Sequence, residues 1–458
     1  MSDRSSASEP NAPAREDRPL ARLKRYAQVS GTLAGQAARF AGRRLLGRPI
    51  DSVAHAAELK AALGGLKGPL MKVAQMLATI PDALPADYAR ALAELQSNAP
   101  PMGRPFVRRR MEAELGPMWR RRFRAFELEP AAAASLGQVH RAVLQDGREV
   151  ACKLQYPDIE AAVEADLAQL KLVFALYRRY DDAVDTRNIY AEIAARLREE
   201  LDYELEARHM ELFRRMLEGE QGVRVPAPVR ELSTRRLLVM DWLEGRPLLA
   251  FKQAPSEVRN ALALKLFRVW YVPFYGYGVV HGDPHPGNYT VGQDLELNLL
   301  DFGCVRKFKP EFVQAVIDLY WALVRGDREL AIASYRTWGF EDLREEVVDI
   351  LNEWAAYLYG PLMDDRPRLV DETRSSHYGR QVAMRVHERL REVGGVVPPR
   401  EFVYMDRAAI GLGAVFLQLA AEVNWHRLFL DLIRDFDVER LRSRQRRLFA
   451  EVGLEPPC

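Results

Sequence analysis

Two short motifs in the middle of the chain bring together the residue types that phosphoryl transfer requires. The first is H-G-D-P-H-P-G-N, residues 281–288, which places Asp283 five residues before Asn288. The second is D-F-G, residues 301–303, which follows a short apolar run. One carboxylate beside the acceptor, followed by an amide and a second carboxylate that hold Mg²⁺, is the layout of a phosphoryl-transfer site. We therefore expect Asp283 to act as the catalytic base, or to orient water, and Asn288 and Asp301 to bind the metal.

Composition and charge narrow the class of protein. The 458 residues suffice for one large or two medium domains, and 48% hydrophobic with 28% charged residues is typical of a globular chain. Lys and Arg total 66 against 64 Asp and Glu, a near balance that argues against a dedicated nucleic-acid binder. Three scattered cysteines (Cys152, Cys304 and Cys458) are too few for a disulfide framework or a zinc knuckle, and they favour a reducing, cytoplasmic compartment.

Neither the N-terminal residues nor the longest apolar run predicts a segment that inserts into a membrane. Residues 1–18 are mostly Ser, Pro, Ala and charged residues, so we expect them to be disordered and we expect no signal sequence. The longest apolar run, Ala408 to Ala421, is interrupted by Gln418 and falls short of the ~20 residues of a transmembrane helix. We expect a buried helix there.

Helical periodicity with a strongly basic bias marks residues 20–46. Seven Arg and Lys and no acid lie between Ala21 and Ile50, which suits a helix on an anionic membrane surface. A solvated basic face on a helix packed within its own domain fits the pattern equally well, and both interpretations stay open. Helical periodicity continues over 51–115, where Lys72 and Gln75 lie three residues apart on one face.

A β-hairpin is expected after residue 130. Ala132, Ala133, Ala134 and Ser135 lead into one strand, and an Asp-Gly turn joins it to a second strand around 149–155. The second strand carries V-A-C-K, close to the V-A-I-K whose lysine contacts the α- and β-phosphates in kinases. A solvent-facing strand lysine is the simpler explanation for Lys153 by itself, but the motifs at 281–288 and 301–303 favour the phosphate role.

The remaining elements divide into two lobes. Helices are expected at about 157–180 and 187–218, and an acid within 199–206 is expected to pair with Lys153. Strands at 222–229 and 235–240 are followed by Met240, Asp241 and Leu243, where the chain leaves the sheet and can hold an adenine. Further helices are expected at 255–277, 310–325, 328–337, 343–360, 379–393, 402–423 and 427–449. A small β-rich lobe (130–245) and a helical lobe (246–458) would hold the nucleotide between them.

Taken together, these motifs resemble the UbiB-like (AarF-like) atypical kinase family, which is linked to coenzyme Q maintenance. The family's alanine-rich loop matches A-A-A-S at 132–135, and its S-[IL]-G-Q-V matches 135–139. H-x-D-P-H-P-G-N matches 281–288, with Gly282 where alanine is usual. E-x-D matches 200–202, and K-x-G-Q matches 72–75, with Ala74 in place of glycine. The resemblance covers about residues 20–305 and extends only loosely to the C-terminal helices.

The resemblance implies an α+β, two-lobed protein-kinase-like fold with an N-terminal helical extension and a mostly helical C-lobe. The implied boundaries are a disordered N-terminus (1–19), the extension (20–125), the N-lobe with inserted helices (126–245) and the C-lobe (246–458). In relatives the K-x-G-Q helix occupies the surface on which a protein substrate would dock. Carried over, Lys72 and Gln75 would approach Glu200 and Asp202, and Glu206 would be the partner of Lys153. The extra methyl of Ala74 would loosen this contact.

The implied cofactors are ATP or ADP with Mg²⁺. Alanines restrict the backbone angles with which glycines wrap phosphates, so we expect weaker or altered capture of the γ-phosphate and ATPase-like behaviour. His281 and His285 are expected to bond the backbone of their loop instead of binding a transition metal. The implied substrate is a quinone precursor or another lipid, and the oligomeric state is not indicated.

Two alternative functions are also compatible with the sequence. A small-molecule kinase of the aminoglycoside or choline-kinase type also uses an H-G-D…N string, which Gly282 fits, but the alanine-rich loop and the 72–75 segment fit it worse. A non-catalytic scaffold that changes shape with ATP would keep the same residues without turnover. The presence of all phosphate and metal residues argues against the scaffold.

Overall fold

The computed structural model describes residues 102–457 apart from 135, 178–185, 342, 373–375, 395 and 397. The chain divides into two compact units, Met1–Ser97 and Asn98–Cys458. Lys72, Gln75, Ser135 and the helix expected at 20–46 lie outside the described residues, and what was expected of them remains a prediction.

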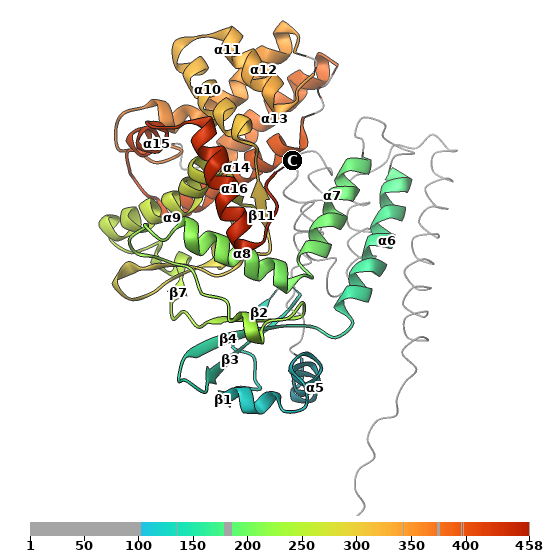
Figure 1. The fold of residues 1–458 in the computed structure, drawn as a ribbon. Coiled ribbons are helices and arrows are strands. Elements are labelled where there is room, and N and C mark those ends of the chain that lie inside the picture. Colours follow the sequence, from blue (N-terminus) through green and yellow to red (C-terminus); the bar gives the residue numbers. More distant parts are fainter. Residues whose placement is uncertain are drawn as a thin grey trace, which may run out of the picture. The chain divides into compact units, whose positions relative to one another are not determined.

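An antiparallel sheet of five strands forms the small lobe (Figure 1). Its strands are β1 (Phe123–Phe126), β2 (Ala132–Ala134), β3 (Gly137–Leu144), β4 (Glu149–Gln155) and β6 (Leu237–Asp241). The order is β1-β3-β4-β6, and β2 pairs with β3. The expected hairpin is confirmed as β3 and β4, and Gly147 in its turn adopts a φ of +90°, which favours glycine.

The chain that precedes the sheet packs on one of its faces. Helix α5 (Arg104–Leu115) and the short 3₁₀ helix η1 (Trp119–Arg122) contribute Val107, Met111 and Trp119 to a core with the strand residues Val150 and Leu154. These residues therefore share a core with the small sheet, and the boundary expected at 125 stays a prediction.

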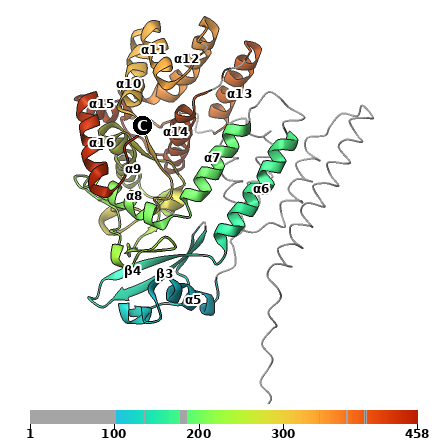
Figure 2. The ribbon, with the colours of Figure 1, turned by 45° about the vertical axis from the view of Figure 1, so that its right-hand side comes forward.

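Between β4 and β6 the described residues form three α-helices, where two were expected. They are α6 (Ile159–Tyr177), α7 (Thr186–Glu199) and α8 (Tyr203–Met216), and α6 lies beside α7 (Figure 2). The prediction of a single helix over 187–218 is wrong, because the helix breaks at Asp202. The Asp202 side chain accepts a hydrogen bond from the Leu205 N–H, 2.9 Å away. This N-cap starts a new helix at Tyr203.

The strand expected at 222–229 divides into two parts. Val223–Arg224 (β5) pairs in parallel with β10 (Leu297–Leu299), in another sheet, whereas Pro228 forms an isolated antiparallel bridge with Met240 of β6. The second sheet has the order β5-β10-β9-β7, with β7 at Arg246–Pro247 and β9 at Tyr289–Val291. A two-stranded ladder of β8 (Val279–His281) and β11 (Val305–Lys307) completes the strands that surround the two motifs.

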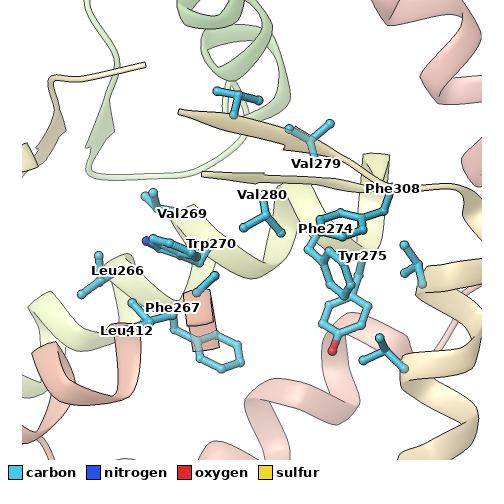
Figure 3. Close-up of a cluster of buried hydrophobic side chains, with 14 of the residues drawn as sticks. Leu266, Phe267, Val269, Trp270, Phe274, Tyr275, Val279, Val280, Phe308 and Leu412 are labelled. Carbon is cyan, nitrogen blue, oxygen red and sulfur yellow. The ribbon is translucent and has the colours of Figure 1, made fainter. Parts of the chain in front are cut away.

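The large lobe is built of helices around α9 (Ser256–Tyr277). The others are α10 (Pro310–Arg325), α11 (Arg328–Trp338), α12 (Glu345–Tyr359), α13 (Ser376–Glu392), α14 (Arg400–Leu419), α15 (Trp425–Ile433) and α16 (Val438–Val452). In the core, Trp270 and Phe274 of α9 belong to one hydrophobic cluster with Val280 of β8 and Leu412 of α14 (Figure 3). Phe308, between β11 and α10, belongs to the same cluster. The single helix expected at 427–449 is broken, because Asp437 caps the start of α16.

Helix α14 corresponds to the apolar run of the sequence. Within the described residues it is the one helix long and apolar enough to cross a membrane, and 29% of its most apolar window is buried. Leu412 and Phe416 are buried, whereas Ile410 is 40% exposed. The expectation of a buried helix is therefore correct for one face only.

A buried carboxyl on α14 should make stability depend on pH. Burial raises the pKa of Asp406 to about 7, although the indole N–H of Trp354 donates to its Oδ1 at 2.7 Å. An unfolded aspartate has a pKa of about 3.9, so between about pH 4 and 7 unfolding releases a proton that the folded state retains. The contribution of Asp406 to stability is full below that window, is lost as the pH rises through it, and changes by up to about 4 kcal/mol.

Asp406→Asn keeps an acceptor for Trp354 and removes the titration. In urea unfolding from about pH 5 to pH 8, the free energy of unfolding should therefore fall more steeply with pH in the wild type than in the variant. Parallel pH profiles for the two proteins would contradict this result.

Candidate active site

The lysine of β4 is held by carboxylates from two distant elements. Lys153 Nζ lies 2.6 Å from Glu206 Oε1 on α8 and 3.4 Å from Asp301 Oδ2. Burial acts to lower the pKa of Lys153, but the nearby carboxylates of Asp301 and Glu206 outweigh it and hold the pKa well above its usual value. The pairing of Glu206 with Lys153 is thus present, and the lysine remains a cation.

The ring of Tyr203 also faces the Lys153 ammonium, with 5.2 Å between Nζ and the ring centroid. Such a contact stabilises a cation against an aromatic face. The Tyr203 hydroxyl is buried and has no hydrogen-bond partner within the described part of the chain. Residue spacing alone had not identified Tyr203, although it lies three positions before Glu206 on the same helix.

The D-F-G segment is folded toward the small lobe. Asp301 Oδ1 accepts a hydrogen bond from the Gly303 N–H at 2.9 Å, which turns its Oδ2 toward Lys153. Phe302 is fully buried against Phe213 of α8, 5.5 Å between ring centroids. His209 Nδ1 bonds the Phe302 carbonyl at 3.2 Å, and burial lowers the pKa of His209 to about 4, so this histidine is neutral at pH 7. Helix α8 therefore positions both the lysine and the D-F-G.

The loop at 281–288 is held by its own side chains. His281 bonds the Asp301 carbonyl through Nε2 at 2.5 Å and accepts the Asp283 N–H at Nδ1. His285 Nδ1 accepts the Gly287 N–H at 3.1 Å. Both histidines bond backbone, as expected. Asp283 Oδ1 accepts the His285 N–H at 3.2 Å, and Asp283 is only partly buried.

Strand pairing brings the two motifs together. β9 begins directly after Asn288 and β10 ends two residues before Asp301, and Tyr289 pairs with Leu299. The Leu300 N–H donates to the Asn288 carbonyl at 3.0 Å. On the other side, the β8–β11 ladder joins His281 to the chain beyond the D-F-G. The expected neighbourhood of Asn288 and Asp301 follows from this antiparallel geometry.

These donor atoms fit a hard divalent cation. Asn288 Nδ2 donates to the Asp283 carbonyl at 3.1 Å, so the nitrogen serves the loop and the amide oxygen is the atom left for a ligand. An amide oxygen with the Asp301 carboxylate matches the oxygen donors that Mg²⁺ prefers. Within the described residues, no group of three or more His, Cys, Asp or Glu is arranged to hold a metal ion.

The residues expected to bind the nucleotide lie on strands of the small sheet. Ala132, Ala133 and Ala134 form the extended strand β2, paired with Val139, Gln138 and Gly137. Met240 and Asp241 end β6, and Leu243 lies just beyond. The Asp241 carboxylate accepts the Ala227 N–H, and the Asp241 N–H donates to the Ala227 carbonyl, each at 3.0 Å. Both groups of Asp241 therefore bind the chain at Ala227.

The E-x-D acids occupy the break between α7 and α8. Glu200 is buried, and a Cβ atom on Gly303 would lie 3.6 Å from its Cγ, so this acid borders the D-F-G. Asp202 caps α8. Their contact with Lys72 and Gln75 falls on residues outside the described part of the chain and stays a prediction.

Gln138 has a structural role that the motif did not reveal. It is 1% exposed, its Oε1 accepts the Met102 N–H at 2.7 Å, and its Nε2 donates to the Met102 carbonyl at 3.3 Å. Two bonds to one peptide segment fix the chain where it enters the small lobe. A glutamine on the inward-facing side of an alternating strand is the signal that could have found it.

Gly282 and Cys304 fit one another across the β8–β11 ladder. A Cβ atom at Gly282 would lie 2.6 Å from Cys304 Sγ and 3.2 Å from the Cys304 carbonyl oxygen, which accepts the Gly282 N–H. Gly282→Ala should therefore destabilise the protein by about 1–2 kcal/mol, and most of this loss should disappear in the double variant with Cys304→Ala. A double-mutant cycle by urea unfolding measures the coupling, and strictly additive effects would contradict the predicted contact.

A strand lysine paired with a helix glutamate, a D-F-G beside it and an Asp-x₄-Asn loop define a protein-kinase-like nucleotide site. Residues 94–335 match the ABC1 atypical kinase-like domain, and the chain belongs to this family of UbiB-like atypical kinases. The match ends within α11, so α12–α16 lie beyond it. The resemblance seen in the motifs and the two-lobed α+β fold are both confirmed.

Two named relatives and one solved structure are similar to the chain. The chain is 28% identical over 449 residues to the mitochondrial atypical kinase coq-8 of Caenorhabditis elegans, covering 91% of this chain but only 57% of that protein. It is 26% identical to the mitochondrial atypical kinase COQ8B of Danio rerio, covering 93% and 70%. A Mycobacterium tuberculosis protein, Rv3197, solved in complex with erythromycin, is similar with a TM-score of 0.59 and 27% identity, covering 83% and 96%.

Proposed function

We propose that this chain is an ATP- and Mg²⁺-dependent atypical kinase or ATPase that supports quinone or isoprenoid-lipid metabolism and does not phosphorylate proteins. The contact of Lys153 with both Glu206 and Asp301 carries the proposal. A lysine so held can neutralise the α- and β-phosphates of ATP, as in kinases. Membership of the atypical kinase-like family supports the same class of activity.

The site residues have separate roles in this proposal. Asp301 and Asn288 would hold Mg²⁺, which neutralises phosphate charge. Asp283 accepts the proton of an acceptor hydroxyl or orients a water molecule, and the His285 N–H holds its carboxylate in place. Glu206 keeps Lys153 in position.

The remaining assignments extend the proposal to nucleotide and substrate. Residues 132–135 would cover the phosphates, and Met240, Asp241 and Leu243 would hold the adenine of ATP or ADP. Lys72 and Gln75, engaged by the acids of the 200–202 segment, would exclude protein substrates. A cytoplasmic location with the basic helix 20–46 on an anionic membrane would bring the site to a lipid substrate.

Mg²⁺-dependent phosphate release tests the proposed activity. Asp301→Asn should lower the rate at least about 100-fold, because it removes a charge that binds the metal and faces Lys153. Asp294→Asn is the matched control, since Asp294 lies on the β9–β10 connection with a φ of +54°, which asparagine tolerates well. Equal, negligible release from wild type and Asp301→Asn would replace the proposal with a nucleotide-switched scaffold.

A further inference from the structure

The segment that leaves the small lobe is built into the sheet that carries the metal ligands. After Leu243 the chain forms β7, and Arg246 pairs with Val291 while Pro247 pairs with Thr290 of β9. β9 starts next to Asn288, and its partner β10 leads to Asp301. The segment that connects the lobes and the strands next to Asn288 and Asp301 therefore belong to one sheet.

Asn298 of β10 fastens this connection. It is 1% exposed, and its Nδ2 donates to the Glu244 carbonyl and to Thr290 Oγ1, each at 3.0 Å. Thr290 is its direct cross-strand partner. One amide group thus bonds the connecting segment and the neighbouring strand together.

The packing beside Asn298 leaves no room for adjustment. A Cβ atom at Gly245 would lie 2.6 Å from Thr290 Oγ1 and 2.9 Å from Asn298 Nδ2. A Cβ atom at Gly292 would lie 3.3 Å from the Glu244 carbonyl oxygen. The backbone of 244–245 rests directly on the β9–β10 hairpin, and any shift of Asn298 must move it.

Asn298 is an unfavourable residue for a core strand position. Its neighbours Leu297 and Leu299 are fully buried, and its own Oδ1 is buried with no hydrogen-bond partner in the described part of the chain. A buried acceptor left unpaired costs stability that an apolar side chain of similar size would not lose. Packing alone therefore does not explain an amide at this position. Its two hydrogen bonds, to the Glu244 carbonyl and to Thr290 Oγ1, indicate that it holds the connecting segment in place.

We propose that Asn298 is a positioning residue for the nucleotide base. It fixes the Glu244 carbonyl, and with it Leu243, at a set distance from the Asn288 and Asp301 side of the site. The inference rests on the proposed function, which places the base at Met240–Leu243. Loss of Asn298 loosens the recognition of the base and leaves the metal ligands in place, because the β9–β10 backbone pairing does not depend on it.

Nucleotide selectivity tests this role with three variants. Asn298→Ala should weaken ATP binding about tenfold and reduce the preference for ATP over GTP, while the Mg²⁺ concentration at half-saturation stays unchanged. Thr290→Val removes one acceptor but keeps the bond to Glu244, and its affinities should stay within about twofold of the wild type. Asn298→Thr, one atom shorter and a better strand former, replaces Asn298→Ala where the alanine variant does not fold.

Fluorescent ATP and GTP analogues provide the affinities, and circular dichroism confirms folding. Equal ATP-to-GTP preference in wild type, Asn298→Ala and Thr290→Val overturns the positioning role, because a purely structural effect changes stability without changing selectivity. A wild type that binds neither nucleotide in the presence of Mg²⁺ overturns the proposed function instead. The two failures are therefore distinguishable.

Discussion

Gly137→Ala should destabilise the small lobe by about 3 kcal/mol and reduce ATP binding severely. A Cβ atom at this position would lie 2.0 Å from the Leu154 carbonyl oxygen and 2.8 Å from its carbonyl carbon. Both are backbone atoms of β4, so no side-chain rotation relieves the clash. The strands must separate where Gly137 pairs with Gln155, two residues from Lys153. The phosphate-binding lysine is displaced together with its strand.

Gly276→Ala is the matched control for this substitution. Gly276 lies inside helix α9, and a Cβ atom there would meet nothing within 4 Å. Because alanine is the better helix former by about 0.5–1 kcal/mol, this variant should be slightly stabilised and should bind ATP normally. Urea unfolding and nucleotide titration of both variants provide the comparison. Wild-type stability and ATP affinity in Gly137→Ala would show that the strands can separate there without cost.

Local signals in the sequence were sufficient where one element determines its own structure. The β3–β4 hairpin follows from strand propensity and an Asp-Gly turn, and α9 and α10 were predicted to within one residue of their observed ends. The position of Asn288 beside Asp301 was also predictable, because the motif spacing fits a short antiparallel hairpin. The pairing of Lys153 with Glu206 came from family motifs and not from periodicity.

Features that depend on distant contacts were not predictable. The α7–α8 break depends on one cap at Asp202, in a run of acids that reads equally well as continuous helix. β5 was assigned to the wrong sheet because its partner, β10, lies more than 70 residues later in the chain. Gln138 and Asn298 look like isolated polar residues in strands, and only the fold shows the backbone groups that they bond.

Lys153→Met should destabilise the protein by about 3–5 kcal/mol, in addition to abolishing ATP turnover. The substitution leaves the Glu206 carboxylate, whose side chain is 3% exposed, without its ammonium partner. Asp301 can respond more easily, because its side chain is 34% exposed and water can solvate it. Glu206→Gln should be milder, since Lys153 keeps Asp301 at 3.4 Å and the amide oxygen can still accept from the lysine. The order of the two effects follows from which charge is left buried.

The double variant Lys153→Met with Glu206→Leu separates folding from catalysis. Two apolar side chains of similar volume replace a buried ion pair, so most of the stability lost in Lys153→Met should return, while phosphate release stays at background. Urea unfolding of the wild type, both single variants and the double variant gives the coupling energy. If the double variant is as unstable as Lys153→Met, the destabilisation comes from somewhere other than the unpaired carboxylate. If the double variant is stable but inactive, the fold does not need the ion pair and phosphate release does. This is the result expected if Lys153 binds the phosphates.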